Sequence, residues 1–315
     1  MKVAITGGTG FVGQNLAKKL LQHGHEVMLI SRGVHQCESA FRSSSRVSFT
    51  ISDLQDRSVL AKAFEGCDTV AHCAGINREI GLQTYKTVHI RGTRNVVDAA
   101  RRACVSKVVL LSFLRARPNC GSPYHESKWA AEKIARGSGL DYTIFKSGMI
   151  YGLGDHMLDH LSHAFHTIPL LATVGYRTKS VRPLAIEDLV RPLVAAIEEK
   201  RMSRQTVAIT GPEELSLADA AQRVAVVLQR KILIFPAPVV FHQLLATLCE
   251  LTMKVPLVSR AQVRILLEGM TQSWEECTKL PPDLQPTTGF TAEQIRKGLP
   301  EPAPFSLHDL RCCLQ

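Results

Sequence analysis

The first half of the chain alternates short apolar runs with longer segments of helical periodicity, and this alternation most strongly limits its fold. Segments with helical periodicity span 11–22, 58–65 and 84–102. Strands this short, separated by helices of this length, form a parallel sheet whose two faces are covered by helices. We therefore predict an α/β fold built on a doubly wound parallel sheet. The predicted strands are Val3–Thr6, Glu26–Ser31, Val47–Ile51, Thr69–Cys73, Val108–Leu111 and Tyr142–Phe145.

The rhythm changes after about residue 150, where helical segments dominate and prolines gather between residues 236 and 304. We predict a core over residues 1–150, to which a strand near 205–211 returns. Residues 151–315 are predicted to form a smaller, mainly helical cap that is interleaved with the core. The cap helices are expected at Glu187–Lys200, Leu217–Leu228, Phe241–Met253 and Arg260–Gly269.

Composition excludes several classes of protein. The chain has 315 residues, 45% hydrophobic and 21% charged, as in ordinary globular proteins. Aromatic residues are only 6%, which argues against a stacking platform for nucleic acid, so no nucleic-acid partner is expected. The formal net charge of +10 predicts affinity for something anionic, either a nucleotide, an acidic partner or a membrane surface. No secretory signal is visible, and we expect a cytoplasmic protein.

A glycine-rich turn joins the first predicted strand to the first predicted helix. Gly7, Gly10 and Gly13 have the spacing that allows a tight turn, close approach of a pyrophosphate, and close packing of helix on strand. The backbone N–H groups that open the helix then face the anion. This context predicts a Rossmann-type NAD(P) site. Its loop residues are Gly7, Thr9, Gly10, Phe11, Val12 and Gly13.

The residues after the second strand indicate which dinucleotide binds. An NAD site normally places an acidic residue there, on the ribose hydroxyls. This chain has Arg32, and a guanidinium can pair with a 2′-phosphate through two charge-assisted hydrogen bonds. NADP(H) is therefore favoured, and NAD(H) remains an alternative, because Arg32 could instead stack on the adenine or lie in solvent.

The ends of the third and fourth strands complete the predicted cofactor site. Asp53 and Leu54 follow the third strand, where the carboxylate either meets the adenine amino group or caps the next helix. Cys73, Ala74 and Gly75 end the fourth strand, where small residues let the nicotinamide side of a cofactor pass close to the backbone.

These residues resemble the short-chain dehydrogenase/reductase superfamily in its extended and atypical branches, which include NAD-dependent epimerases and dehydratases. The resemblance covers about the first 215 residues. Within the superfamily, the segments 182–189 and 266–272 resemble the group that contains the nucleotide-binding accessory subunit of respiratory complex I. The motifs that carry the resemblance are TGGTGFVG at Thr6–Gly13, Asp53-Leu54, CAGINRE at Cys73–Glu79, GTRN at Gly92–Asn95, YHESK at Tyr124–Lys128 and MIYG at Met149–Gly152.

Tyr124 and Lys128 carry the predicted chemistry. Their spacing of four places both side chains on one helix face. We expect the lysine cation to lower the pKa of the phenol, which then exchanges a proton with a substrate oxygen while hydride moves to or from nicotinamide. The resemblance implies that Lys128 also bonds the nicotinamide ribose. The alternative is a chance pair on a surface helix.

Two positions depart from the family pattern. The family places a Ser or Thr beyond the fifth strand, where it polarises the substrate oxygen. Here Ser112 is at the strand end, one or two residues early, and Ser122 is the substitute candidate. The family's Asn before the Gly-Thr pair is His89. Cofactor binding is thus a firmer prediction than turnover.

Two further patterns have a plain interpretation and a more specific one. His156, His160 and His163 share one helix face, which suits zinc, but without a partner Cys we predict a polar helix and no metal. The helices 241–253 and 260–270 are apolar with basic neighbours. We favour a buried cap over a substrate pocket, and keep open a face for an anionic membrane surface or a protein partner. The chain is expected to be a monomer or a homodimer.

Three functions remain open. The first is an NADP(H)-binding oxidoreductase or epimerase-like enzyme on an unidentified carbonyl or hydroxyl substrate, with Tyr124 as acid/base, Lys128 as its electrostatic partner and Ser112 on the substrate oxygen. The second is a catalytically weak or inactive nucleotide-binding subunit of a respiratory complex I type. The third is an NADP(H) sensor, which has no evident need for both Tyr124 and Lys128.

Overall fold

The computed structural model describes residues 1–33, 41, 43–176, 179–253, 258–301 and 304. The chain divides into two compact units, each built from several segments. The first unit comprises Met1–Ser147, Ile186–Ile209 and Gln272–Gln285, and the second comprises Gly148–Ala185, Thr210–Thr271 and Pro286–Gln315.

A seven-stranded sheet forms the centre of the first unit, and all of its strands are parallel. In space the strands follow the order β11-β6-β5-β4-β1-β2-β3. The order reverses between β1 and β4, and doubly wound sheets bind ligands at such a reversal. The predicted fold is confirmed. The strands are β1 (Lys2–Thr6), β2 (Glu26–Ser31), β3 (Val47–Ile51), β4 (Thr69–His72), β5 (Lys107–Phe113), β6 (Asp141–Ser147) and β11 (Gln205–Ile209).

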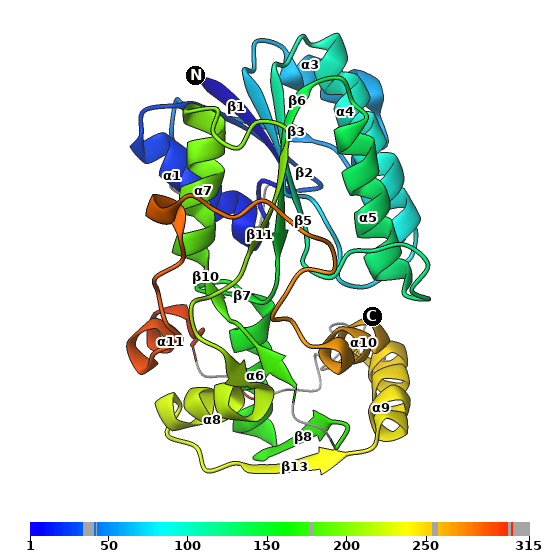
Figure 1. Ribbon diagram of the computed structural model, residues 1–315, viewed down its shortest axis with the longest axis vertical. Helices are drawn as coiled ribbons and strands as arrows, with labels where there is room; N and C mark the ends of the chain where they lie inside the picture. Colours follow the sequence, from blue (N-terminus) through cyan, green and yellow to red (C-terminus); the bar gives the residue numbers. More distant parts are fainter. Residues whose placement is uncertain (34–40, 42, 177–178, 254–257, 302–303, 305–315) are drawn as a thin grey trace. The chain divides into compact units, whose positions relative to one another are not determined.

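Helices cover both faces of this sheet (Figure 1). On one face α1 (Phe11–Gln22) packs against α7 (Ile186–Glu198). On the other lie α3 (Arg57–Phe64), α4 (Gly92–Arg102) and α5 (Pro123–Arg136). The strands buried between the two layers are apolar on both sides, and Val3, Ala4 and Ile5 of β1 are fully buried.

Most boundaries predicted for helices and strands agree with the structure to within two residues. The helix over Phe11–Gln22 and the strands at Glu26–Ser31 and Val47–Ile51 begin and end where the sequence predicts. Other boundaries shift by one or two residues, and one segment differs in kind: the single helix expected over 84–102 is a π-helical segment, η1 (Lys86–Arg91), followed by α4. A π-helical turn inserts one extra residue per turn, which sequence periodicity does not reveal.

The second unit combines helices with three short strand pairs. The pairs are β7 (Ile150–Tyr151) with β10 (Leu184–Ala185), β9 (Ser180–Val181) with β12 (Leu215–Ser216), and β8 (Leu170–Val174) with β13 (Leu233–Ala237). The helices are α6 (His156–Thr167), α8 (Leu217–Val227), α9 (Val239–Thr252), α10 (Arg260–Glu268) and α11 (Ala292–Gly298). No helix among the described residues is long and apolar enough to cross a membrane.

The prediction that the helix near 241–253 is buried is wrong. Helix α9 buries only His242, Ala246 and Cys249, while leucines on its other side are exposed. The helix is apolar nearly all round, and such a pattern normally indicates burial. Sequence periodicity cannot show which side of such a helix another element covers.

The segment Gln272–Gln285 returns to the first unit, where a buried cluster of charges holds it. Glu132 of α5 and Lys146 of β6 are both fully buried, and 3.3 Å separates their charged atoms. Glu275 of the returning segment accepts from Lys146 at 2.9 Å and from Arg136 at 2.9 Å. Arg136 also donates to Glu132 at 3.0 Å. Two carboxylates thus pair with two cations, and this pairing offsets the desolvation cost of burying charged groups. The segment contains η2 (Pro282–Leu284).

Removing one member of this cluster should destabilise the protein strongly. We expect Glu132→Ala to lower the free energy of unfolding by about 3–5 kcal/mol, because Lys146 would remain buried without the one fully buried carboxylate that pairs with it. Urea unfolding followed by circular dichroism measures the change. The matched control is Glu293→Ala, which breaks an exposed pair with Lys297 and should have little effect. Equal effects of the two substitutions would contradict the prediction.

Candidate functional site

The glycine loop between β1 and α1 is packed too tightly for any larger residue. Gly7 has a φ of +70°, and a Cβ there would lie 2.8 Å from the backbone of Ala74. A Cβ on Gly13 would clash with the Gly7 carbonyl oxygen and lie 2.9 Å from the Gly8 Cα. The loop closes through a 2.9 Å hydrogen bond from Gly10 N to Gly7 O. The three glycines therefore let loop, strand and helix approach as a pyrophosphate site requires.

The N-terminus of α1 opens directly from this loop. Its N-cap is Gly10, and no side chain caps the helix. The first turn therefore directs backbone N–H groups of Phe11, Val12 and Gly13 outward, where a phosphate can accept them. Thr9 is nearly buried, and its carbonyl oxygen accepts a 2.7 Å hydrogen bond from the Gln14 side chain. The loop residues predicted from sequence thus lie together and fit the diphosphate of a dinucleotide.

The neighbouring strand ends place the remaining predicted cofactor residues at the same edge of the sheet. Arg32 follows β2 and is exposed. Asp53 follows β3, is exposed, and accepts a 2.9 Å hydrogen bond from Gln55 N. The alternative that Asp53 caps the next helix is wrong, because the N-cap of α3 is Asp56. Leu54 is buried with a φ of +73°. This uncommon backbone conformation is held by Asn95, which donates to the Leu54 oxygen at 2.8 Å.

The end of β4 brings the glycine loop close to Lys128. Cys73 donates its backbone N–H to Thr6 O at 3.1 Å, and Ala74 contacts Gly7. A Cβ on Gly75 would lie 3.0 Å from the Lys128 Nζ. Burial raises the pKa of the Cys73 thiol to about 12, so it stays neutral. Small uncharged residues therefore lie between the loop and the lysine, and close passage of a nicotinamide along them stays a prediction.

Tyr124 and Lys128 lie on the first turns of α5, whose N1 residue is Pro123. The Tyr124 ring is 7% exposed and is surrounded by aromatic rings, with the Phe113 centroid at 5.2 Å and the Tyr85 centroid at 5.6 Å. The Lys128 Nζ donates to Leu111 O at 3.4 Å. The aromatic enclosure fixes the tyrosine ring, while the lysine is only partly covered.

The pKa values of this pair differ from the sequence-based expectation. Burial raises the pKa of Tyr124, and the Tyr85 charge adds to the effect. Burial lowers the pKa of Lys128 to about 8, against the opposing effect of Glu132. Desolvation thus raises the phenol pKa, where the sequence predicted that the lysine would lower it. At neutral pH the tyrosine is a neutral phenol and the lysine is largely protonated, and a neutral phenol suits proton donation.

His89 takes the place of the family's Asn and connects η1 to α5. Its Nε2 accepts from Ile76 N at 3.1 Å, so the proton is assigned to Nδ1, which donates to Ser127 Oγ at 2.8 Å. Ser127 in turn donates to the Tyr124 carbonyl oxygen at 2.8 Å. Burial and the Lys128 cation hold the pKa of His89 well below its usual range. His89 is therefore a neutral positioning group for the helix that carries Tyr124.

A second buried histidine, His72, links the glycine loop to η1. Its Nδ1 accepts from Thr6 Oγ1 at 2.6 Å, and its Nε2 donates to Thr93 Oγ1 at 2.9 Å. Thr93 Oγ1 donates to the His89 carbonyl oxygen at 2.5 Å. Burial lowers the pKa of His72 to about 3. Sequence reasoning missed His72 and Thr93, although one polar residue at the end of an otherwise apolar strand was a visible signal.

The two serines predicted for the substrate oxygen both have internal partners. Ser112 is 4% exposed, and its hydroxyl donates to Glu132 Oε1 at 2.5 Å. Ser122 is 5% exposed, and its hydroxyl lies 2.6 Å from the His125 Nδ1. A role on a substrate oxygen stays a prediction for both, because each hydroxyl would first have to leave its partner.

The histidines of α6 do not assemble a metal site in the structure. The rings of His156 and His160 have centroids 6.2 Å apart. His163 Nδ1 bonds to the backbone oxygen of Asp159 at 2.8 Å. Within the described part of the chain, no group of three or more His, Cys, Asp or Glu side chains could hold a metal ion.

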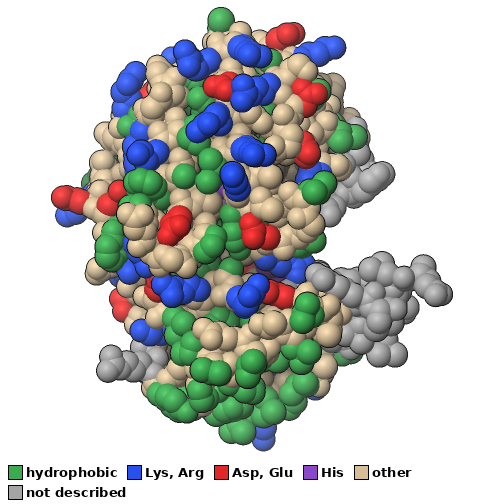
Figure 2. Space-filling view, turned by 90° about the vertical axis from the view of Figure 1, so that its right-hand side faces the viewer, with side chains coloured by type: hydrophobic (Ala, Val, Ile, Leu, Met, Phe, Trp, Pro, Cys, Tyr) green, Lys and Arg blue, Asp and Glu red, His purple; other side chains and the backbone are tan. Residues whose placement is uncertain are grey.

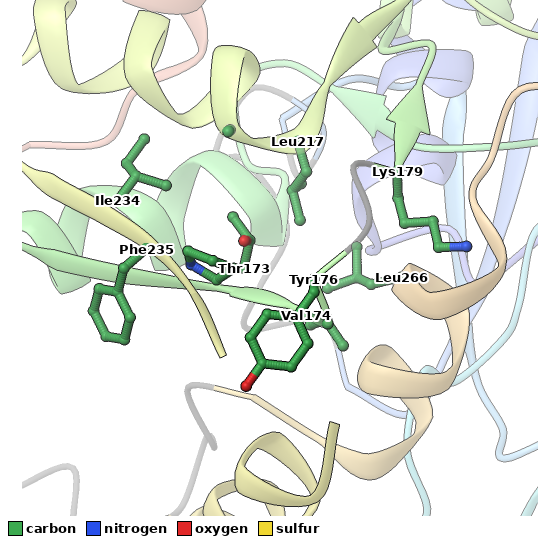
Figure 3. Close-up of a pocket in the computed structure, with 11 residues that line it drawn as sticks. Thr173, Val174, Tyr176, Lys179, Leu217, Ile234, Phe235 and Leu266 are labelled. Carbon is green, nitrogen blue, oxygen red and sulfur yellow. The ribbon is translucent and has the colours of Figure 1, made fainter. Parts of the chain in front are cut away.

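The second unit contains a cavity of about 250 Å³ (Figure 3). Thr173, Val174 and Tyr176 line it from β8 and the turn after it, and Ile234 and Phe235 line it from β13. Leu217, Leu266 and Lys179 complete the labelled lining. This lining is mostly apolar with one ammonium group, and small-molecule sites commonly combine an apolar wall with a few polar groups.

Comparison with known proteins finds a match over the part of the chain that contains the glycine loop. Residues 7–155 match the family described as NAD(P)H-binding. The matched residues make up just under half of the chain and include the glycine loop and the Tyr124–Lys128 pair. Solved structures share the fold of this chain. UDP-glucuronic acid 4-epimerase from Bacillus cereus superposes with a TM-score of 0.70 at 18% identity, over 94% of this chain and 97% of that one. At this identity the likeness shows the fold alone.

Several curated proteins are similar in sequence to this chain. The ceramide reductase of Caulobacter vibrioides is 31% identical over 195 residues, which is 61% of this chain and 60% of that protein. A mouse protein, NADH dehydrogenase (ubiquinone) 1 alpha subcomplex subunit 9, is 22% identical over 268 residues, 82% of this chain and 70% of that one. The chain spans only 29% of the length of the uncharacterised mycobacterial proteins that it also matches.

Nucleotide binding should weaken as the pH rises through about 8. The pKa of Lys128 is lowered to about 8, so its positive charge is present below this pH and is lost above it. We expect NADPH to bind more tightly at pH 7 than at pH 9.5, measured by isothermal titration calorimetry. Lys128→Met should bind more weakly than wild type at pH 7 and show a smaller change between the two pH values. A wild-type affinity that does not change would contradict the assignment.

Proposed function

We propose that this chain is an NADP(H)-dependent reductase that converts a carbonyl group to an alcohol. Tyr124 donates its phenolic proton to the carbonyl oxygen, and Lys128 holds the nicotinamide ribose and stabilises the phenolate that remains. The bound dinucleotide supplies the hydride to the carbonyl carbon. The phenolate then regains a proton from solvent, so one carbonyl, one hydride and one proton give one alcohol.

The observation that carries the proposal is the placement of Tyr124 and Lys128 on one face of α5, with the tyrosine ring buried. Burial raises the pKa of the phenol, so Tyr124 holds its proton at neutral pH. An acid is what reduction requires, whereas oxidation of an alcohol starts with a base. The Lys128 ammonium lies one helical turn away from Tyr124. This arrangement favours the reductive direction over the epimerase or dehydratase chemistry of some structural relatives.

Substitution of the phenol tests the enzymatic proposal. Tyr124→Phe should lower NADPH oxidation with a panel of aldehydes and ketones by at least about 100-fold, because it removes the acid. NADPH affinity should stay unchanged. The matched control is Tyr142→Phe, which alters a half-buried tyrosine on β6 and should retain full activity. Equal loss in both variants, or full activity in Tyr124→Phe, would contradict the proposal.

The preference for NADP(H) rests on Arg32, which is exposed at the end of β2, with no acidic residue at that position. Arg32→Ala should weaken NADPH binding by about 10–100-fold and leave NADH binding unchanged, because it removes the charge that meets the 2′-phosphate. Calorimetry with both nucleotides measures this. Arg101→Ala, an exposed arginine in the last turn of α4, serves as the control. Wild-type binding of NADH as tight as that of NADPH would contradict the preference.

A second function is favoured by one observation, the hydrogen bond that occupies the Ser112 hydroxyl. A nucleotide-binding structural or assembly subunit needs the dinucleotide site but no group for a substrate oxygen. The similarity to a complex I subunit agrees with this alternative. It predicts tight nucleotide binding, no turnover with any carbonyl compound, and co-purification with a stable protein partner. A sensor of NADP(H) would share the first two properties without that partner.

A further inference from the structure

The outward side of α9 in the second unit is an uninterrupted apolar stripe. Val240 is 63% exposed, Leu244 68%, Leu248 58% and Leu251 68%. These positions recur every three to four residues, so they lie on one face of the helix. Phe241, 47% exposed, lies beside them. The residues buried on α9 lie on the opposite side, so the stripe is not part of the core of this unit.

The strands next to α9 extend this apolar surface. Leu233, 62% exposed, and Phe235, 38% exposed, belong to β13, which leads into α9 through Pro238. Leu170 of β8 pairs with Leu233 and is 48% exposed. Figure 2 shows hydrophobic side chains gathered over the lower part of the molecule, the region of α9 and β13 in Figure 1. Single exposed apolar residues are common on protein surfaces, whereas exposed apolar residues that adjoin one another, as these do, mark an interaction site.

The charges near this surface are basic. Arg230 and Lys231 immediately precede β13 and are both exposed. The sequence has no acidic residue between Asp219 and Glu250. Glu250 is the single charged residue of α9, and its carboxylate pairs with Arg260 at 3.1 Å. The apolar stripe therefore has cations beside it and no carboxylate within it.

We propose that this surface, formed by the outward faces of α9 and β13, docks on a lipid bilayer that contains anionic lipids. Leucines and Phe241 enter the boundary between headgroups and acyl chains, and Arg230 and Lys231 lie among the anionic headgroups. A protein interface would be expected to contain more aromatic residues, arginines and hydrogen-bonding groups, whereas the exposed stripe is mostly Leu and Val. The docking is peripheral and does not depend on whether the chain is a reductase.

Flotation of the whole protein with vesicles tests the proposal. We expect the protein to float with vesicles of phosphatidylcholine containing 30% phosphatidylglycerol at low ionic strength, and to float less with phosphatidylcholine alone. Leu244→Glu with Leu248→Glu should lower the vesicle-bound fraction at least about tenfold, because two exposed leucines no longer enter the bilayer. Arg230→Glu with Lys231→Glu should remove the preference for the anionic vesicles.

The matched control introduces the same two charges elsewhere. Ile51→Glu with Leu82→Glu replaces exposed apolar residues of the first unit, 66% and 93% exposed, and should float as wild type does. Circular dichroism melting confirms that each variant is folded. Wild-type protein that stays at the bottom of the gradient, or a Leu244/Leu248 variant that floats as well as the control, would overturn the proposal. So would a wild-type dimer that this variant converts to a monomer, since a second copy would then cover the surface.

Discussion

The chain of hydrogen bonds from Thr6 through His72 and Thr93 to His89 holds the candidate site of the first unit together. It begins at the glycine loop and ends on the π-helical segment, and His89 continues it through Ser127 to the helix that carries Tyr124. In the assigned arrangement both imidazoles are neutral, each with one ring nitrogen that accepts and one that donates. Burial ensures this, because it holds the pKa values of both histidines below their usual range. The glycine loop and the helix that carries Tyr124 and Lys128 are thus positioned by one buried network.

The buried charges around Glu132 connect the stability of the first unit to the charge of Lys128. Glu132 is one helical turn beyond Lys128, and its charge opposes the lowering of the Lys128 pKa by burial. The same carboxylate accepts from Ser112 and pairs with Lys146. Changing Glu132 would therefore alter folding, the lysine charge and the freedom of the Ser112 hydroxyl together. Glu275 extends this network to a segment more than 120 residues later in the sequence.

Most of the fold and the outline of the site could be predicted from local sequence. Each signal that was used involves residues close together in the sequence. These signals are the alternation of strands and helices, the three loop glycines, and the spacing of Tyr124 and Lys128. The structure confirms the parallel sheet and brings the predicted loop residues together. The pKa of Tyr124 was predicted with the wrong sign, because the degree of burial depends on rings contributed by distant segments.

The sequence by itself determined the doubly wound fold and the dinucleotide loop, because hydrophobic period and glycine spacing act over one strand or one helical turn. Tertiary structure alone decided which polar groups are engaged and which apolar faces are left open. The pairing of Ser112 with Glu132 and the relay through His72 join residues 20 or more positions apart. The exposed stripe of α9 was likewise invisible in the sequence, since a helix that is apolar all round does not reveal which side its neighbours cover.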